Sequence, residues 1–300
     1  RFLTEYQKLA QELLAIPVIT GRKTAGERFA GADETYTMEG FMPDGKALQM
    51  GTSHDLGQNF ARVFNIRFSG EDEKEHIPWQ NSWGVSTRLI GAVIMAHGDD
   101  KGLVLPPRLA KTKIVIVPII FEATRETVMN AARALERQLS SFGVVMDTRE
   151  NYSAGWKFNE WEMKGIPLRI ELGPRDVGQN QCVLVRRDTN EKITVSLNNI
   201  EKTIEDELEA MHQSLFQKGE KWVHESLVTV KTMNEFQEAL EKRKLIRMLF
   251  CGQVECEKEI KEKTTASSRC IPLDEKPIKG GVCVQCGKPA EWHTLFAKAY

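Results

Sequence analysis

Residues 113–142 read KIVIVPIIFEATRETVMNAARALERQLSSF, and this stretch decides the fold class. The apolar run at 114–120 is interrupted only by Pro118, and it predicts a strand whose first half is buried on both faces. Residues 124–142 then repeat apolar side chains at helical spacing, and Gly143 ends the pattern. A buried strand followed by an amphipathic helix predicts an α/β unit.

The segments around this stretch extend the same alternation. Short apolar runs at 144–147, 168–172 and 182–186 predict further strands, and Ile200 to Leu215 marks a closing amphipathic helix. Strands that alternate with helices at these lengths predict a small three-layered α/β domain over residues 111–219.

The flanking blocks, 1–110 and 220–300, have mixed patterns. In the first block we expect a helix near the start, a strand entry at 16–19 and short strands and turns over 21–52. A helix at 54–64, a short strand at 64–68, a strand at 81–87 and an apolar helix at 89–96 follow. The third block shows a β-like run at 227–230, a helix at 233–240 and a cysteine-rich end.

Composition excludes some classes of protein. The chain has 300 residues, with 41 Lys and Arg against 42 Asp and Glu, and a net charge of -1. This balance excludes a histone-like basic protein, although a local basic face can still bind nucleic acid. The longest apolar run, 114–121, is far shorter than the ~20 residues that span a bilayer, so we expect no membrane association.

Two cysteine pairs near the end have the spacing of a metal site. Cys251 and Cys256 are separated by four residues, Cys283 and Cys286 by two, and 26 residues lie between the pairs. Four thiolates at this spacing favour a closed, tetrahedral and structural zinc site. The alternative is a set of reduced cysteines without metal. Cys270 lies between the pairs and is expected to be a spare, buried thiol.

Two segments of the first block carry polar groups suited to a ligand. Residues 49–54, Gln-Met-Gly-Thr-Ser-His, place an amide, a hydroxyl and an imidazole at a glycine-permitted turn, or they form a helix start capped by Thr52 or Ser53. Arg88 lies at a strand-to-helix junction, where it either grips a phosphate or is an ordinary surface arginine. The Gly-Asp-Asp turn at 98–100 is a weak metal signal, because polar turns need no metal.

Residues 147–176 interleave basic and aromatic side chains. Such a pattern suits stacking on unpaired bases with phosphate contacts nearby, or it describes an amphipathic segment with tryptophans in a core. The charged candidates for base contacts are Arg149, Lys157, Glu162, Arg169, Glu171 and Arg175.

Taken in order, these segments resemble the prolyl-tRNA synthetases of the archaeal and eukaryotic-cytoplasmic type, which are class II aminoacyl-tRNA synthetases. The resemblance covers essentially the whole chain. The residues that carry it are IPVI (16–19), GRKT (21–24), FAGA (29–32), GTSHDLGQNF (51–60), QNSWG (80–84), HGDDKGLVLPPR (97–108), WKFN (156–159), GPRD (173–176), TLF (294–296) and Tyr300.

The resemblance implies a fold for each block. Residues 1–110 would be part of a class II antiparallel-sheet catalytic domain that carries motif 3. Residues 111–219 would be an α/β anticodon-binding domain with a mixed sheet, and residues 220–300 a small α+β domain that binds zinc. Motifs 1 and 2 would lie upstream of Arg1, so we expect the chain to correspond to a C-terminal portion that is inactive alone.

The resemblance also implies roles. Arg88 would be the catalytic arginine on the ATP phosphates, with Gln49, Thr52 and Ser86 also binding ATP. His54 would line a proline pocket walled by Phe29 and Trp83. The six charged candidates named above would bind the anticodon, and Cys251, Cys256, Cys283 and Cys286 would hold Zn²⁺.

The expected reaction is ATP-dependent activation of L-proline, with Mg²⁺, followed by transfer to tRNA(Pro). A cytoplasmic homodimer is expected. Two alternatives remain open, a non-catalytic tRNA-binding or translation-accessory protein that keeps the anticodon domain, and a zinc-stabilised interaction module.

Overall fold

A computed structural model describes residues 1–300, which divide into two compact units. The first comprises Arg1–Gln11, Ile16–Ala92 and Gly219–Tyr300, and the second comprises Glu12–Ala15 and Val93–Lys218. Two helices, α3 (Arg88–His97) and α7 (Ile200–Ser226), begin in one unit and end in the other. No helix combines the length and the apolar character needed to cross a membrane.

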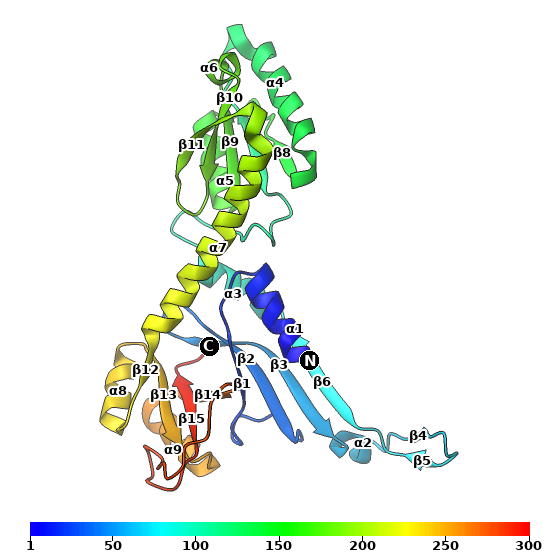
Figure 1. Cartoon of the computed structure of the whole chain (residues 1–300), viewed down its shortest axis with the longest axis vertical. Helices are drawn as coiled ribbons and strands as arrows, with labels where there is room; N and C mark the ends of the chain where they lie inside the picture. The colour runs from blue at the N-terminus through cyan, green and yellow to red at the C-terminus, as the bar shows by residue number, and fades with distance from the viewer. The chain divides into compact units, whose positions relative to one another are not determined.

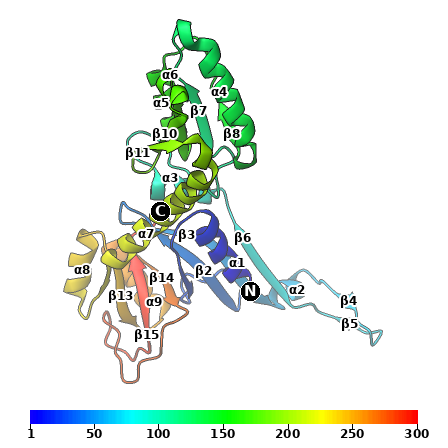
Figure 2. The same ribbon diagram turned by 45° about the horizontal axis from the view of Figure 1, so that its top comes forward.

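An eight-stranded sheet forms the centre of the first unit (Figures 1 and 2). Its order is β12-β13-β15-β14-β1-β2-β3-β6, with antiparallel pairing everywhere except between β12 and β13. The strands are β1 (Ile19–Arg22), β2 (Glu34–Phe41), β3 (Ala47–Gly57), β6 (Gln80–Val85), β12 (Leu227–Thr229), β13 (Leu245–Phe250), β14 (Ser267–Pro272) and β15 (Trp292–Ala297). The first and third expected blocks therefore share one sheet.

The two blocks join where β1 pairs with β14. Gly21 lies opposite Pro272, and a Cβ atom at Gly21 would lie 2.5 Å from Cβ of Cys270. Because no side chain fits there, glycine is what allows the two strands to meet.

Short helices and a hairpin complete the first unit. Its further elements are α1 (Phe2–Lys8), a π-helical turn (Leu9–Leu13), α2 (Asn59–Val63), the hairpin β4 (Phe68–Ser69) with β5 (Glu75–His76), α8 (Met233–Glu241) and α9 (Val254–Thr264). Helices α8 and α9 pack on β13–β15 around a core that includes Phe236, Ile260 and Phe296.

Three expectations for the first block were wrong. Residues 21–52 contain two long strands, β2 and most of β3, rather than short strands and turns. His54 belongs to β3 and not to a helix, and the helix that follows covers only Asn59–Val63. The strand expected at 64–68 does not form, and only Phe68 of that range belongs to a strand, the two-residue β4. Pairing of β3 on both sides, with β2 and β6, satisfies its backbone and overrides the local helical pattern.

A five-stranded mixed sheet forms the second unit, in the order β11-β10-β9-β7-β8. The strands are β7 (Ile114–Pro118), β8 (Val144–Met146), β9 (Leu168–Leu172), β10 (Gln181–Arg186) and β11 (Lys192–Ser196). β7 runs parallel to β8 and β9, and the remaining pairs are antiparallel. The expected strands and the mixed sheet are confirmed.

Helices cover both faces of this sheet, as three layers require. The helices are α4 (Arg125–Gln138), α5 (Ala154–Met163), α6 (Pro174–Gly178) and α7, with short 3₁₀ turns at Glu122–Thr124, Ser140–Phe142 and Leu197–Asn199. Leu135 of α4 and Ile204 of α7 pack on the face of Ile114 and Ile170. The opposite face, which presents Arg169 and Glu171, lies under α5.

Candidate functional site

The first candidate site lies on β3 beside the start of α3. The guanidinium Nη1 of Arg88 donates a hydrogen bond to the backbone carbonyl of Gln49 at 3.1 Å, and the backbone N–H of Arg88 is 3.3 Å from Oγ of Ser86. Thr52 lies opposite Gly84 of β6, where no side chain covers the sheet. The structure thus places Arg88 against Gln49 and Ser86, with Thr52 opposite Gly84 on the adjacent strand, although Gln49 and Arg88 are more than thirty residues apart.

His54 and Phe29 lie together at the other end of β3. Their ring centroids are 4.7 Å apart, and Nδ1 of His54 is 3.0 Å from Oγ1 of Thr35. Burial lowers the pKa of His54, so its imidazole is neutral near pH 7. A neutral ring against a phenyl ring forms a wall of low polarity.

Trp83 is not part of this pair. Residues directly opposite each other in an antiparallel pair share a face, and Trp83 lies opposite Ser53, one position from His54. Trp83 therefore belongs to the other face of the sheet, where its ring stacks on Phe2 with centroids 4.3 Å apart.

A buried ionic cluster supports the strands below Gln49. Glu39 of β2 lies opposite Gln49, and its carboxylate accepts from Nζ of Lys23 at 2.9 Å and from Nη2 of Arg269 at 2.7 Å. All three side chains are less than a tenth exposed. Burial acts to raise the pKa of Glu39, but Lys23 and Arg269 outweigh it, and the pKa lies below its ordinary value. Because Arg269 belongs to β14, this cluster links the third block to the strand next to the site.

In the second unit, Arg149 and Lys157 converge on one carboxylate. Asp147 accepts from Nε of Arg149 at 2.9 Å and from the indole N–H of Trp161 at 2.9 Å, and Nζ of Lys157 lies 3.7 Å away. Burial acts to raise the pKa of Asp147, but the bonds from Arg149 and Trp161 outweigh it and lower the pKa. Lys157 is buried, so its ammonium holds Asp147 and does not reach solvent.

Arg149 is also the centre of an aromatic stack. Its guanidinium lies 5.3 Å from the ring centroid of Tyr152 and 5.2 Å from that of Trp156, and these two rings stack at 3.8 Å. Tyr152 and Trp156 are both about two-fifths exposed. Exposed stacked rings beside a guanidinium offer a platform for an unpaired base.

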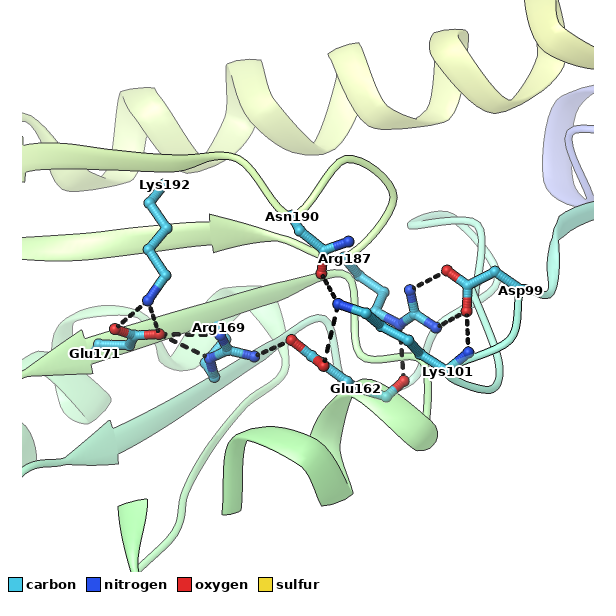
Figure 3. Close-up of polar contacts among 8 residues, drawn as sticks. All are labelled: Asp99, Lys101, Glu162, Arg169, Glu171, Arg187, Asn190 and Lys192. Atoms are coloured by element: carbon cyan, nitrogen blue, oxygen red, sulfur yellow. Dashed lines mark hydrogen bonds and ion pairs between the residues drawn. The ribbon is translucent and has the colours of Figure 1, made fainter. Parts of the chain in front are cut away.

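Glu162, Arg169 and Glu171 form a connected network in the same unit (Figure 3). Nη1 of Arg169 donates to Glu162 at 3.2 Å, and Nη2 donates to Glu171 at 2.9 Å. Lys192 donates to both oxygens of Glu171 at 3.0 Å. Glu162, Arg169 and Lys192 border a pocket of about 410 Å³ between α5 and strands β9–β11, whereas Glu171 lies behind them and does not line it.

Sequence reasoning missed several residues of this pocket. Lys101, Phe158, Asn190 and Lys192 all line it, and the guanidinium of Arg169 lies 4.4 Å from the ring centroid of Phe158. Phe158 belongs to the basic and aromatic pattern but was not chosen as a binding residue, and nothing in the sequence pointed to Lys101, Asn190 or Lys192. Arg175, by contrast, is exposed at the start of α6 and does not line the pocket.

The four predicted cysteine ligands lie together in the first unit. Their sulfur atoms are all within 4.8 Å of one another, with 3.8 Å between Cys256 and Cys283 and 3.7 Å between Cys251 and Cys286. Edges of about 3.8 Å are those of a tetrahedron with metal–sulfur bonds of about 2.3 Å, so the cluster fits a metal ion. Cys270 is buried in β14, outside the cluster, as expected.

Local turns create this arrangement. Cys251 follows β13, Cys256 lies in α9, and the other two cysteines lie between β14 and β15. The N–H of Gly287 bonds the carbonyl of Cys283 at 2.9 Å with φ of +70°, which closes a tight turn around the second pair.

Two sequence families match the chain. The family described as "Prolyl-tRNA synthetase, C-terminal" matches residues 233–300, and the family described as "Anticodon binding domain" matches residues 113–207. The second match covers the sheet and α5, which border the charged pocket.

Curated relatives match the whole chain. A proline–tRNA ligase of Alkaliphilus oremlandii is 47% identical over 100% of the chain, and proline–tRNA ligase 2 of Clostridioides difficile is 46% identical over 99%. A proline–tRNA ligase of Ruminiclostridium cellulolyticum is also 46% identical. The chain spans 62% of the length of each of these relatives.

Proposed function

This chain belongs to the prolyl-tRNA synthetase family, and we propose that it serves the ATP-dependent attachment of L-proline to tRNA(Pro). The observation that carries the proposal is the contact of Arg88 with Gln49 on an uncovered strand face, in the same chain as an anticodon-type pocket. A protein that only bound RNA would need the pocket and not the strand face.

The strand face would bind ATP. Arg88 would neutralise the phosphates with a planar guanidinium, while Gln49, Thr52 and Ser86 would supply polar contacts. Gly84 leaves the sheet open beside Thr52, which gives a flat base access to the backbone. Mg²⁺ would enter with ATP as part of the substrate and neutralise phosphate charge.

His54 and Phe29 would line the proline site. The proline ring is small and apolar, and a neutral imidazole beside a phenyl ring presents matching low polarity. Trp83 lies on the opposite face of the sheet from His54 and stacks on Phe2 there. Its side chain would therefore have to leave this position to contact a proline ring beside His54.

The reaction would proceed in two steps on this face. The carboxylate of proline attacks the α-phosphorus of ATP, and pyrophosphate leaves. The terminal ribose hydroxyl of the tRNA then attacks the prolyl carbonyl, and AMP leaves. Both steps depend on charge stabilisation and positioning, which Arg88 would provide, and neither is assigned a general base.

The charged pocket of the second unit would read the anticodon. The proline anticodon contains two guanines, whose edges offer both donors and acceptors. Glu162 can accept from the donor edge, whereas Arg169, Lys101 and Lys192 can donate to the acceptors. Glu171 would support this reading by holding Arg169 and Lys192 in place. Arg149 would add a contact beside its aromatic stack, Lys157 would support Asp147, and Arg175 would meet the RNA from α6.

The cysteine cluster would hold one structural Zn²⁺. Four thiolates close the tetrahedral shell and leave no position for a reactive water, so the metal would stabilise the fold only. As in the family it resembles, the protein would act as a cytoplasmic homodimer with a class II catalytic sheet.

The test is proline-dependent ATP–pyrophosphate exchange by the full-length gene product. Activity with proline and not with other amino acids is expected, and Arg88→Ala should abolish most of it. Arg67→Ala is a matched control, because Arg67 is an exposed arginine directly before β4 whose side chain bonds the exposed Asn65 and Glu75. Absence of exchange together with retained tRNA binding would instead favour the non-catalytic alternative.

A further inference from the structure

Arg187 is a buried arginine that the proposed chemistry does not use. Its side chain is 1% exposed, and it lies directly after β10 in the second unit. Its guanidinium makes three charge-assisted hydrogen bonds. Nε donates to the backbone carbonyl of Glu162 at 2.8 Å, and the two terminal nitrogens donate to Asp99 at 2.6 and 2.7 Å. Arg187 therefore ties the end of α5 to the loop after α3.

Asp99 connects Arg187 to Lys101. Besides its bonds from Arg187, Oδ1 of Asp99 accepts from the backbone N–H of Lys101 at 2.9 Å, which fixes the turn. The hydrogen bond from Arg187 lowers the pKa of Asp99 to about 2, so the carboxylate is charged at neutral pH. The Gly-Asp-Asp turn thus uses its first aspartate for an ion pair.

Lys101 and Glu162 then meet in the pocket. Nζ of Lys101 donates to Asn190 at 3.2 Å and lies 3.8 Å from the Glu162 carboxylate, whose other oxygen accepts from Arg169 at 3.2 Å. Figure 3 shows one continuous chain of polar contacts from Asp99 through Lys101 and Glu162 to Arg169, Glu171 and Lys192. All its members belong to the second unit.

We infer that the Asp99–Arg187 ion pair positions Lys101 and Glu162, and that it thereby sets how strictly the pocket discriminates anticodon bases. Arg187 holds Glu162 by its backbone, and Asp99 holds Lys101 by its backbone. Asp99 and Lys101 lie outside residues 113–207, the range matched by the anticodon-binding family. The inference rests on the proposed tRNA-binding function of this pocket.

Fixed side chains matter here because the pocket contains both signs of charge. A base is read by the relative position of donors and acceptors, and an error of about 1 Å loses a hydrogen bond. Glu162 lies between two cations, Lys101 and Arg169. If Lys101 moved away, Glu162 would turn toward Arg169 and present a different edge to the base.

The test compares Asp99→Asn with Asp100→Asn in the full chain. Both variants remove one negative charge from the same turn, but Asp100 is exposed and its side chain takes no part in the network. The probes are two anticodon stem-loop RNAs, one with the guanines of the proline anticodon and one with adenine in place of a guanine. The measured quantity is the ratio of their dissociation constants.

Asp99→Asn should reduce this ratio by roughly five- to tenfold, and Asp100→Asn should leave it unchanged. An unchanged ratio in Asp99→Asn would overturn the inference. So would an equal loss of affinity for both RNAs, because that result describes a structural role only.

Two further variants keep the test decisive if Asp99→Asn folds poorly. Lys101→Met removes a half-exposed ammonium and should reduce the same ratio. In a background that carries both Lys101→Met and Glu162→Gln, Asp99→Asn should cause no additional loss, because the effect passes through these two residues. Additive losses would refute this route. If the unmodified chain fails to discriminate the two RNAs, the proposed anticodon function itself is wrong, a result distinct from the failure of the variants.

Discussion

Replacement of Glu39 by glutamine should strongly destabilise the sheet of the first unit. The change keeps the shape of the side chain but removes the only charge that balances Lys23 and Arg269 within this cluster. Those two side chains are 2% and 7% exposed, so water cannot replace the lost carboxylate. The amide would also point a donor at one of the two cations. Leaving buried cations uncompensated costs about 3–5 kcal/mol, and we expect a loss in this range.

Hydrogen exchange measured by mass spectrometry can report this loss for the first unit alone. In Glu39→Gln the opening free energy of peptides from β2 and β3 should fall by about 3–5 kcal/mol, whereas peptides from β7 and β9 serve as an internal reference. Glu75→Gln is the matched control, because Glu75 is 71% exposed in its pair with Arg67, and it should cost under about 1 kcal/mol. A loss below about 1 kcal/mol in Glu39→Gln would refute the reasoning.

Three other predictions concern the Glu39 cluster, the cysteine cluster and Arg88. The pKa of Glu39 is lower in the folded chain than its ordinary 4.5. Its stabilising effect is therefore present above pH 4.5 and is lost as the pH falls through the folded-state pKa. The opening free energy of β2 peptides should fall less steeply with decreasing pH in Glu39→Gln than in the unmodified chain. Cys283→Ser should lose bound zinc in elemental analysis and Cys270→Ser should retain it, and equal zinc content in the two variants would contradict the assigned ligands. Arg88→Ala in the full-length protein should weaken ATP binding by ~1.5–3 kcal/mol in calorimetry, and unchanged affinity would remove its phosphate role.

The fold of the second unit follows from local sequence patterns. The apolar run at 114–118 predicts its strand, because a strand buried on both faces is apolar at every position. The apolar stripe of 125–138 predicts its helix, because a helix buried on one side repeats apolar residues at helical spacing. The cysteine cluster was equally predictable, since ligand spacing is itself local. Gly143, with φ of +73°, ends the α4 region where the sequence predicted.

Strand β3 shows why the first block was harder to predict. Its segment 47–57 is rich in glycine and polar residues, and nothing in that order marks eleven residues of strand. Its extended conformation comes from hydrogen bonds to the preceding strand β2 and to β6, which begins more than twenty residues after β3 ends.

The candidate sites also combine features that residue types predict with features that depend on long-range pairing. The contact of Arg88 with Gln49 agrees with the residue types chosen from sequence, but the separation of Trp83 from His54 depends on strand register. Lys101 and Arg187 carry no local signal, because their role depends on which loop meets which helix. Long-range pairing is therefore the information that the sequence patterns lack.

The pairing of β1 with β14 also constrains how the protein is made. Glu39 and Arg269 are 230 residues apart, so β2 leaves the ribosome long before its buried partner is synthesised. Until residues 267–297 emerge, β1 is an open sheet edge and Lys23 and Glu39 lack the third member of their cluster. Nascent chains in this interval would present a strand edge prone to pairing with other chains. Ribosomes that stall before this point should leave the first unit dependent on chaperones, while the second unit, whose strands all lie within 114–196, can already fold.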